Sequence, residues 1–105
     1  MADALTLVGD RWALLALREL GFGVTRFTDI QGFTGAPRAS LAARLRDLEA
    51  SGLVERRRYS EHPPRDEYLL TRAGQDLMPV IGALREWGER YATPLVRDHG
   101  PDPSG

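Results

Sequence analysis

Arginine is the residue whose number and placement in this chain most clearly predict chemistry. All fourteen basic side chains are Arg, and seven of them lie between residues 38 and 65 beside four acids, a local balance of +3. The rest of the chain carries a balance of −4, which brings the net charge to −1. Guanidinium groups form paired hydrogen bonds with phosphate oxygens and with guanine. The clustering therefore favours contact with a nucleic acid, although arginine-rich codon usage would explain the absence of Lys equally well.

A helix predicted over about residues 37 to 51 carries the first of these arginines. Leu41, Leu45 and Leu48 are four and three residues apart, which places them on one helical face. Pro37 suits the first helical position, and Gly52 provides a stop. If the leucines face the core, the opposite face of the helix is free to meet a ligand.

A shorter helix is predicted just before it, starting after Thr25 and ending near Gln31. Thr25 is expected to cap this helix, and Phe27 and Ile30 to lie buried beneath it. Residues 32 to 36 then form a turn, so the two helices make a helix-turn-helix pair. Because helix N-termini favour anions, Thr25 and Arg26 could hold a phosphate group.

A basic ribbon follows the helix pair. Residues 53 to 59 are predicted to form a strand, residues 60 to 66 a wing turn, and residues 68 to 70 the returning strand. Pro63 and Pro64 restrict the turn and lower the entropy cost of holding it in one shape. Arg65 would then be presented to the minor groove or its backbone.

The predicted DNA contacts come from the first helix of the pair, the second helix and the ribbon. Arg38 is expected to contact a base or a phosphate, and Arg44 and Arg46 to contact phosphates. Small outward Ala side chains would let the second helix lie deep in a major groove. Taken singly, each Arg is more simply an ordinary solvated residue, and it is the group that favours DNA. The full predicted set is Thr25, Arg26, Arg38, Ala39, Ser40, Ala43, Arg44, Arg46, Arg57, Arg58 and Arg65.

Three further helices are predicted around this unit. Residues 3 to 8 form a short first helix with Leu5 and Val8 facing inward. Asp10 caps a central, well-buried helix over residues 11 to 20. A C-terminal helix is expected to start after Thr71, to run to about residue 91 and to kink at Pro79. Together these elements predict one domain over residues 1 to 92, with a disordered tail from 93 to 105.

The apolar stripe of the C-terminal helix predicts a homodimer. The stripe is wider than one small domain needs, so part of it is expected to pack against a second subunit. The alternative is that the stripe covers only its own core. The predicted interface residues are Leu5, Val8, Val80, Leu84, Trp87 and Tyr91.

The aromatic residues suggest an alternative function. Trp12, Phe22, Trp87 and Tyr91 could line an apolar interface cavity for a small aromatic or apolar effector, although core packing is the simpler interpretation. The chain would then be a small-molecule receptor, or a ligand-processing dimer, with weak or lost DNA binding. A protein-binding adaptor is a third class, for which the sequence offers no positive signal.

The residue types give little support for thiol sensing, metal binding or catalysis. The chain has no cysteine, which removes thiol sensing, and its two histidines, His62 and His99, do not make a usual zinc site. The glycine-containing stretch from residue 32 to residue 40 lacks the Lys of a phosphate-binding loop. We therefore expect no enzyme, no metal and no cofactor. We also find no signal peptide and no membrane-spanning run, so we expect a cytoplasmic bacterial protein.

Segments spread over residues 5 to 91 carry a family pattern. They are Gly9-Asp10-Arg11-Trp12, Arg26-Phe27-Thr28-Asp29-Ile30, Leu41-Ala42-Ala43-Arg44-Leu45, Gly52-Leu53-Val54-Glu55-Arg56, Pro63-Pro64-Arg65-Asp66-Glu67-Tyr68 and Arg85-Glu86-Trp87-Gly88. In this order the chain resembles the HxlR-type family of bacterial winged helix-turn-helix regulators. The wing segment and the segment ending in Trp87-Gly88 are the most specific parts of the resemblance.

The resemblance implies a mainly α fold with a small β-ribbon (α+β). It also implies a homodimer joined by its N- and C-terminal helices, which binds double-stranded DNA and represses or activates transcription. Many members respond to electrophiles, oxidants or other small molecules. Two features depart from the pattern. No cysteine is present to react with such compounds, and Ala36 or Pro37 stands where many members have a Ser or Thr helix cap.

Overall fold

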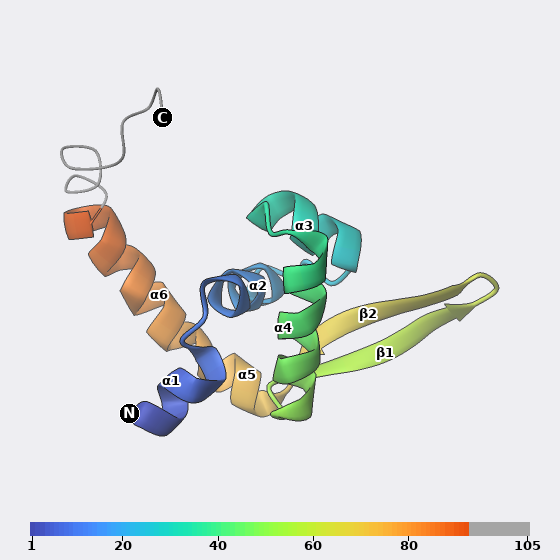
Figure 1. Cartoon of the computed structure of the whole chain (residues 1–105), viewed down its shortest axis with the longest axis horizontal. Coiled ribbons are helices and arrows are strands. Elements are labelled where there is room, and N and C mark those ends of the chain that lie inside the picture. The colour runs from blue at the N-terminus through green and yellow to red at the C-terminus, as the bar shows by residue number, and fades with distance from the viewer. Residues whose placement is uncertain (93–105) are drawn as a thin grey trace.

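Helix α2 lies at the centre of the structure. The computed structural model describes residues 1 to 92, and Figure 1 shows the other elements arranged around α2. The helices are α1 (Ala2–Val8), α2 (Arg11–Gly21), α3 (Phe27–Thr34), α4 (Arg38–Ala50), α5 (Arg72–Asp76) and α6 (Met78–Trp87), followed by a π-helical turn, η1 (Gly88–Ala92). Strands β1 (Val54–Glu61) and β2 (Pro64–Leu70) form a two-stranded antiparallel sheet. The predicted fold, mainly α with a β-ribbon in a winged helix-turn-helix arrangement, is confirmed.

The hydrophobic core lies where α2, α3 and α4 meet. Leu17, Ile30, Leu41 and Leu45 are fully buried, and Leu48 is 1% exposed. The inward row predicted for the second helix is therefore confirmed. Burial of one such side chain stabilises the folded state by about 1.5–3 kcal/mol. Because three of these leucines belong to α4, the core fixes which face of that helix points outward.

The start of α2 is held as the sequence predicts. The Asp10 carboxylate accepts hydrogen bonds from the backbone N–H groups of Trp12 and Ala13 at 2.9 and 3.0 Å. Helix α1, by contrast, buries none of its residues. Val8 packs against the core, but Leu5 is 57% exposed, so the prediction that Leu5 faces inward is wrong.

Helix α3 starts one residue later than predicted. Its N-cap position is Arg26, with no side-chain cap, so the prediction that Thr25 caps the helix is wrong. The backbone carbonyl of Thr25 instead accepts a hydrogen bond from the N–H of Tyr68 at 2.8 Å. This bond holds the segment before α3 against the outer edge of β2.

The turn between α3 and α4 is shorter than predicted. Helix α3 continues past Gln31 to Thr34, where Gly35 ends it with a φ of +72° that favours glycine. Pro37 takes extended backbone angles and precedes α4 as its N-cap residue, so it is not the first helical residue. Helix α4 ends at Ala50. Gly52 follows with a φ of +80°, which favours glycine, and turns the chain toward the sheet.

The ribbon is longer than predicted, and its turn is tighter. Strand β1 reaches Glu61, which pairs with Pro64, so only His62 and Pro63 lie between the strands. The ribbon projects from one side of the core as a long arm, and α6 leads away on the other side (Figure 1). The wing and the C-terminal helix are thus held far apart by the α2–α4 unit.

The predicted C-terminal helix is two helices. Thr71 caps α5 as expected, because its hydroxyl oxygen accepts a hydrogen bond from the N–H of Gly74 at 3.3 Å. The chain then breaks at Leu77, and Pro79 falls in the first turn of α6, where its missing N–H costs no helical hydrogen bond. The predicted kink at Pro79 within a single helix is therefore wrong. The predicted tail from residue 93 onward lies outside the described residues.

Candidate DNA interface

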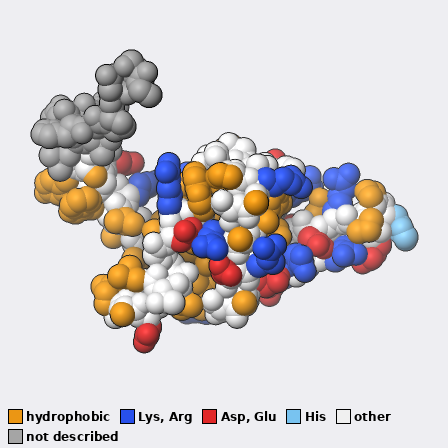
Figure 2. Space-filling view, in the orientation of Figure 1, with side chains coloured by type: hydrophobic (Ala, Val, Ile, Leu, Met, Phe, Trp, Pro, Cys, Tyr) orange, Lys and Arg blue, Asp and Glu red, His pale blue; other side chains and the backbone are white. Residues whose placement is uncertain are grey.

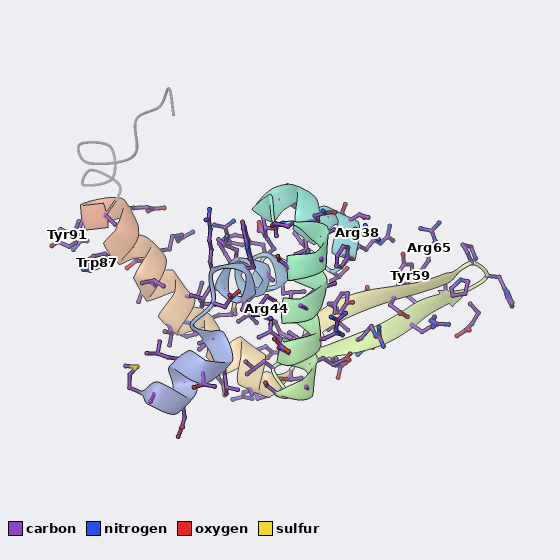
Figure 3. The ribbon with its side chains drawn as sticks, viewed as in Figure 1. Arg38, Arg44, Tyr59, Arg65, Trp87 and Tyr91 are labelled. Atoms are coloured by element: carbon purple, nitrogen blue, oxygen red, sulfur yellow. The ribbon has the colours of Figure 1, made fainter. Side chains whose placement is uncertain are left out.

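The helix pair and the ribbon bring candidate residues to one part of the molecule. Figure 3 shows Arg38, Arg65 and Tyr59 on the side of α3, α4 and the wing, with Trp87 and Tyr91 at the distant end of α6. Figure 2 shows Arg side chains spread over the same α4 and wing region, with acids between some of them. Arg38 and Arg65 are therefore separated in space from Trp87 and Tyr91.

Arg38 is held at the junction of the two helices of the pair. It is the first residue of α4, and its guanidinium carbon lies 5.0 Å from the ring centroid of Phe27, the first residue of α3. A cation–π contact at an exposed site contributes about 0.5–1 kcal/mol. The contact restricts the long Arg38 side chain and keeps its charge beside the N-termini of both helices.

Those two N-termini are free of side-chain caps. Neither Arg26 before α3 nor Pro37 before α4 supplies a capping hydrogen bond. The first backbone N–H groups of a helix have no acceptor within the helix, and the helix dipole favours a negative charge there. Two uncapped helix starts flanked by Arg26 and Arg38 are therefore suited to bind phosphate groups.

Arg26 is positioned by the wing. Its guanidinium carbon lies 4.9 Å from the ring centroid of Tyr59. In the sheet register Arg58 faces Asp66 and Ser60 faces Arg65, which leaves Tyr59 as the extra residue of a β-bulge. A bulge changes the direction in which a strand side chain points. Here the bulged residue is Tyr59, and its contact with Arg26 links the ribbon to the start of α3.

The outward face of α4 is small and polar near its start. Ala39 and Arg46 are exposed, whereas Ser40 and Ala43 are half-buried. The outward direction predicted for Ala39 and Arg46 is confirmed. No carboxylate lies within 4.0 Å of the guanidinium of Arg46 or Arg38 among residues 1 to 92. Both charges are thus available to an anionic ligand.

Arg44 lies in a different setting. Its guanidinium is 3.1 Å from Asp47 of the same helix and 3.7 Å from Asp10, the cap of α2. Its Nε is buried without a hydrogen-bond partner. Figure 3 places Arg44 beside α2 and away from the wing. These contacts link α4 to α2, so we exclude Arg44 from the proposed interface, although the sequence predicts that it contacts phosphate.

Most wing arginines have acidic partners. Arg58 donates hydrogen bonds to Asp66 at 2.8 Å and to Glu61 at 3.5 Å, and the bond to Asp66 raises the pKa of Arg58 above its ordinary value. Arg57 pairs with Glu55 at 2.8 Å. Arg65 is exposed, and within the described chain it has no carboxylate within 4.0 Å. Of the three wing arginines named by the sequence prediction, Arg65 is therefore the best placed for DNA.

Two aromatic residues of this interface are absent from the sequence-predicted set. Phe27 is predicted as a core residue, but it is half-buried and carries Arg38 on its ring. Tyr59 is predicted only as a strand residue. An alternating strand pattern contains no signal for a bulge, and the Arg26 contact spans distant parts of the sequence. Only the placement of aromatic residues among arginines could have suggested these pairs.

The four aromatic residues predicted to line an effector pocket do not form one within residues 1 to 92. Trp12 is half-buried against the core, with the Arg11 guanidinium carbon 4.6 Å from its ring centroid. Trp87 and Tyr91 contact each other with ring centroids 5.8 Å apart. Phe22 lines a hollow between α2 and α6 that the other three do not line. Within the described single chain these four residues therefore share no pocket, and a cavity completed by a second subunit stays a prediction.

The predicted dimer residues are mostly exposed. Leu5, Val80, Leu84, Trp87 and Tyr91 are between 50% and 60% exposed, whereas Val8 is half-buried against the core. Exposed large apolar side chains on the N- and C-terminal helices are typical of a surface that another chain covers.

The described residues contain neither a metal-binding cluster nor a membrane-spanning helix. No three His, Cys, Asp or Glu side chains gather in a metal-binding group within residues 1 to 92. In the same part of the chain, no helix combines the length and apolar character needed to cross a membrane.

Comparisons of sequence find regulators of transcription. Rv3095 of Mycobacterium tuberculosis, an uncharacterised HTH-type transcriptional regulator, is 50% identical over 98 residues, which are 93% of this chain and 60% of that protein. The chain thus spans about 60% of the length of this relative. An HTH-type regulator of Methanothermobacter thermautotrophicus is 40% identical over 91 residues, 86% of this chain and 70% of that protein.

Comparisons of structure agree. The reduced form of the redox regulator HypR has a TM-score of 0.81 and 32% identity, and the match covers 90% of this chain and 94% of that one. The reduced form of the transcriptional regulator YodB from B. subtilis has a TM-score of 0.74 and 33% identity, with 90% and 93% covered. All four proteins are described as regulators and none as an enzyme. Because residues 7 to 95 match the HxlR-like helix-turn-helix model, the chain belongs to the HxlR-like family of transcriptional regulators.

Proposed function

We propose that the protein is a sequence-specific regulator that binds double-stranded DNA through α3, α4 and the wing. The observation that carries this proposal is a set of exposed arginines: Arg26 and Arg38 at two uncapped helix starts, Arg46 further along α4, and Arg65 in the wing. Helix α4 lies in the major groove, and the wing lies on the adjacent minor groove or its backbone. A protein with this function acts in the cytoplasm, where bacterial DNA is found.

Each part of this surface has a distinct role in the proposed complex. Arg26 and the start of α3 bind a phosphate, which fixes the register of the protein on the duplex. Arg38 contacts a base edge or a phosphate beside it, and Ala39 allows α4 to approach thymine methyl groups. Arg65 contacts the backbone beside the minor groove. The phosphate contacts supply affinity, and the base contacts supply sequence preference.

The regulator acts as a homodimer in this proposal. The exposed apolar residues of α1 and α6 lie away from the DNA-binding side, so a second chain can cover them without blocking α4 (Figure 3). Two recognition helices related by a twofold axis read half-sites about 34–36 Å apart. The operator is accordingly expected to be a palindrome or close to one.

Replacing Arg38 by Ala tests the DNA-binding proposal. We expect the affinity for an operator duplex to fall about 10- to 100-fold, because a good guanidinium contact contributes about 1–3 kcal/mol. The melting temperature should fall by only a few degrees, since Arg38 is exposed, has no ion pair among the described residues and loses only its contact with Phe27. Fluorescence anisotropy against the DNA upstream of the gene, with a scrambled duplex beside it, measures the loss.

A matched control is Arg72→Ala. Arg72 is also exposed, but it lies on α5 and pairs with Asp76 at 3.0 Å. Its removal should leave the DNA affinity unchanged. If Arg38 contacts phosphate, its removal also lowers the slope of log affinity against log salt by about 1. Equal affinities for the Arg38 variant and the unmodified protein would contradict the proposed placement of α4.

Replacing Tyr59 by Leu tests the contact between wing and helix. We expect a two- to fivefold loss of affinity, since the Tyr59 ring restricts Arg26 by a cation–π contact of about 0.5–1 kcal/mol. The control Tyr59→Phe keeps the ring and should retain the affinity. Anisotropy titrations of both variants on one duplex make the comparison. If the two variants lose affinity equally, the hydroxyl group matters rather than the ring, and the contact has been misassigned.

The proposed regulator also responds to a small molecule. HypR is described as a redox regulator. The 105 residues of this chain contain no cysteine, so a thiol in this chain cannot provide such a response. The response proposed here is noncovalent binding, and the hollow between α2 and α6 supports it.

A further inference from the structure

An apolar groove runs between α2 and α6, away from the DNA-binding side. One hollow of about 170 Å³ is lined by Arg18, Gly21, Phe22, Met78, Ile81, Gly82 and Arg85. A second hollow of about 170 Å³ shares Arg18, Ile81 and Arg85 with it and adds leucines of both helices. Because the two hollows share three residues, they lie side by side along the α2–α6 groove. An enclosed cavity of about 150 Å³ is large enough to bind benzene.

Two arginine side chains line the groove beside its apolar residues. Arg18 and Arg85 line both hollows. The Nε of Arg18 is buried and has no hydrogen-bond partner, and its Nη2 is 3.6 Å from Glu19, which is longer than a hydrogen bond. Within residues 1 to 92, Arg85 has no carboxylate within 4.0 Å. The neighbouring Glu19 also has a buried carboxylate oxygen, Oε2, without a hydrogen-bond partner, but Glu19 lines neither hollow. Among the residues that line the two hollows, the only charged side chains are Arg18 and Arg85, so the lining is positively charged.

We infer that this groove binds a small aromatic carboxylate, with its carboxylate group between Arg18 and Arg85 and its ring against Phe22, Met78 and Ile81. A planar guanidinium suits a carboxylate because it offers two parallel N–H donors. A buried donor without a partner costs free energy, which an anionic ligand at Arg18 would recover. The apolar floor then selects ligands that carry a ring over small inorganic anions.

Gly82 leaves space in the groove for the aromatic ring of the proposed ligand. A Cβ at Gly82 would have no atom within 4 Å, so a side chain there would extend into the open space of the groove. Gly21, on the opposite wall, is closely approached by the Met78 sulfur. Gly82 therefore keeps the groove open, and a large side chain at this position would fill it.

The groove and the proposed dimer face share only one residue within the described chain. Residues 78, 81, 82 and 85 recur at helical spacing and line the groove, whereas Val80, Trp87 and Tyr91 belong to the exposed row alone. Leu84 belongs to that row and also lines the second hollow. At about 100° per residue, these two rows lie on different sides of α6. A dimer formed through the exposed row thus leaves most of the groove to a ligand.

This inference deepens the proposed effector response and rests on that response, but its test does not involve DNA. Sodium benzoate is titrated into the full-length chain in a calorimeter, with benzamide and sodium acetate as the matched probes. Benzamide keeps the ring without the charge, and acetate keeps the charge without the ring. We expect one benzoate per chain, bound at least about tenfold more tightly than either control probe.

Two variants locate the binding. Arg85→Gln should weaken benzoate binding at least about tenfold, and Gly82→Leu should abolish it by filling the groove. Leu is a better helix former than Gly, so the Gly82 variant should melt no earlier than the unmodified protein. Arg72→Gln removes an exposed charge outside the groove and should leave benzoate binding unchanged.

Three results would overturn the inference. The first is no heat from benzoate at millimolar concentration. The second is equal binding of benzoate, benzamide and acetate, which would show an adventitious additive only. The third is unchanged binding in the Arg85 variant. If benzoate fails to bind and Arg85→Gln shifts the protein toward monomer in sedimentation, a second copy of the chain occupies the groove instead. DNA binding is unaffected by any of these outcomes, so failure here is distinguishable from failure of the proposed DNA function.

Discussion

Replacing Leu84 by Glu is expected to convert the protein to a monomer and to lower its affinity for a full operator by roughly 10²- to 10⁴-fold. Leu84 is 53% exposed in the single chain and lies in the row with Val80, Trp87 and Tyr91. A charge placed in a buried dimer interface would lack a partner and would oppose association. Because Leu and Glu are both good helix formers, α6 should persist. The affinity for the full operator therefore falls because the two recognition helices are no longer linked.

Sedimentation velocity measures the assembly, and two duplexes separate the possible causes. The Leu84 variant should bind a single half-site as well as the unmodified chain does, but should lose the gain from the full site. Phe33→Glu is a matched control for assembly, because Phe33 is also exposed, at 66%, but lies on α3. This control should remain a dimer. A Leu84 variant that stays dimeric would place the interface elsewhere.

Local sequence patterns correctly predicted several elements of the fold. The spacing of Leu41, Leu45 and Leu48 identified the buried face of α4, since one face of a helix must cover the core. Asp10 and Thr71 each capped the helix that they precede. These features depend on residues within one or two helical turns, and such short-range signals are readable from a single sequence.

The features that the sequence did not reveal depend on contacts between distant residues. Arg44 pairs with Asp10, a residue 34 positions away, which removes a charge that local reasoning assigns to DNA. Tyr59 meets Arg26 only because a bulge displaces it in the sheet. Helical periodicity continues through Leu77, so it did not predict the break between α5 and α6. In each case tertiary packing decided the outcome.

The single chain does not bring the four predicted aromatic residues together, for a related physical reason. Residue type indicated that Trp12, Phe22, Trp87 and Tyr91 could bind a ring, but it contained no information on their distances. The structure places Trp12 against the core and Trp87 at the far end of α6. It reveals instead a groove whose cations, Arg18 and Arg85, were not singled out by the sequence. A pocket is a property of the fold, so it can be located only after the helices have been placed.

Replacing Leu45 by Ala is expected to lower the free energy of unfolding by about 2–5 kcal/mol. Leu45 is fully buried, so truncation removes its contacts and leaves a cavity in the centre of the core. Single domains are stable by only about 5–15 kcal/mol, so this loss is a large fraction of the total. Urea denaturation followed by far-ultraviolet circular dichroism measures the change in midpoint.

The neighbouring residue provides the matched control, because on the same helix Leu45 is buried in the core and Arg46 is exposed. Arg46→Ala should leave the urea midpoint within about 0.5 kcal/mol of the unmodified protein, since Arg46 is exposed. It should lower the salt slope of DNA binding by about 1 if Arg46 contacts a phosphate. Leu45→Ala, studied at a temperature where it remains folded, should keep that salt slope. A midpoint that falls equally in both variants would mean that Arg46 also supports the fold, and α4 would then lack the separation of its core and DNA-binding faces on which the proposed function depends.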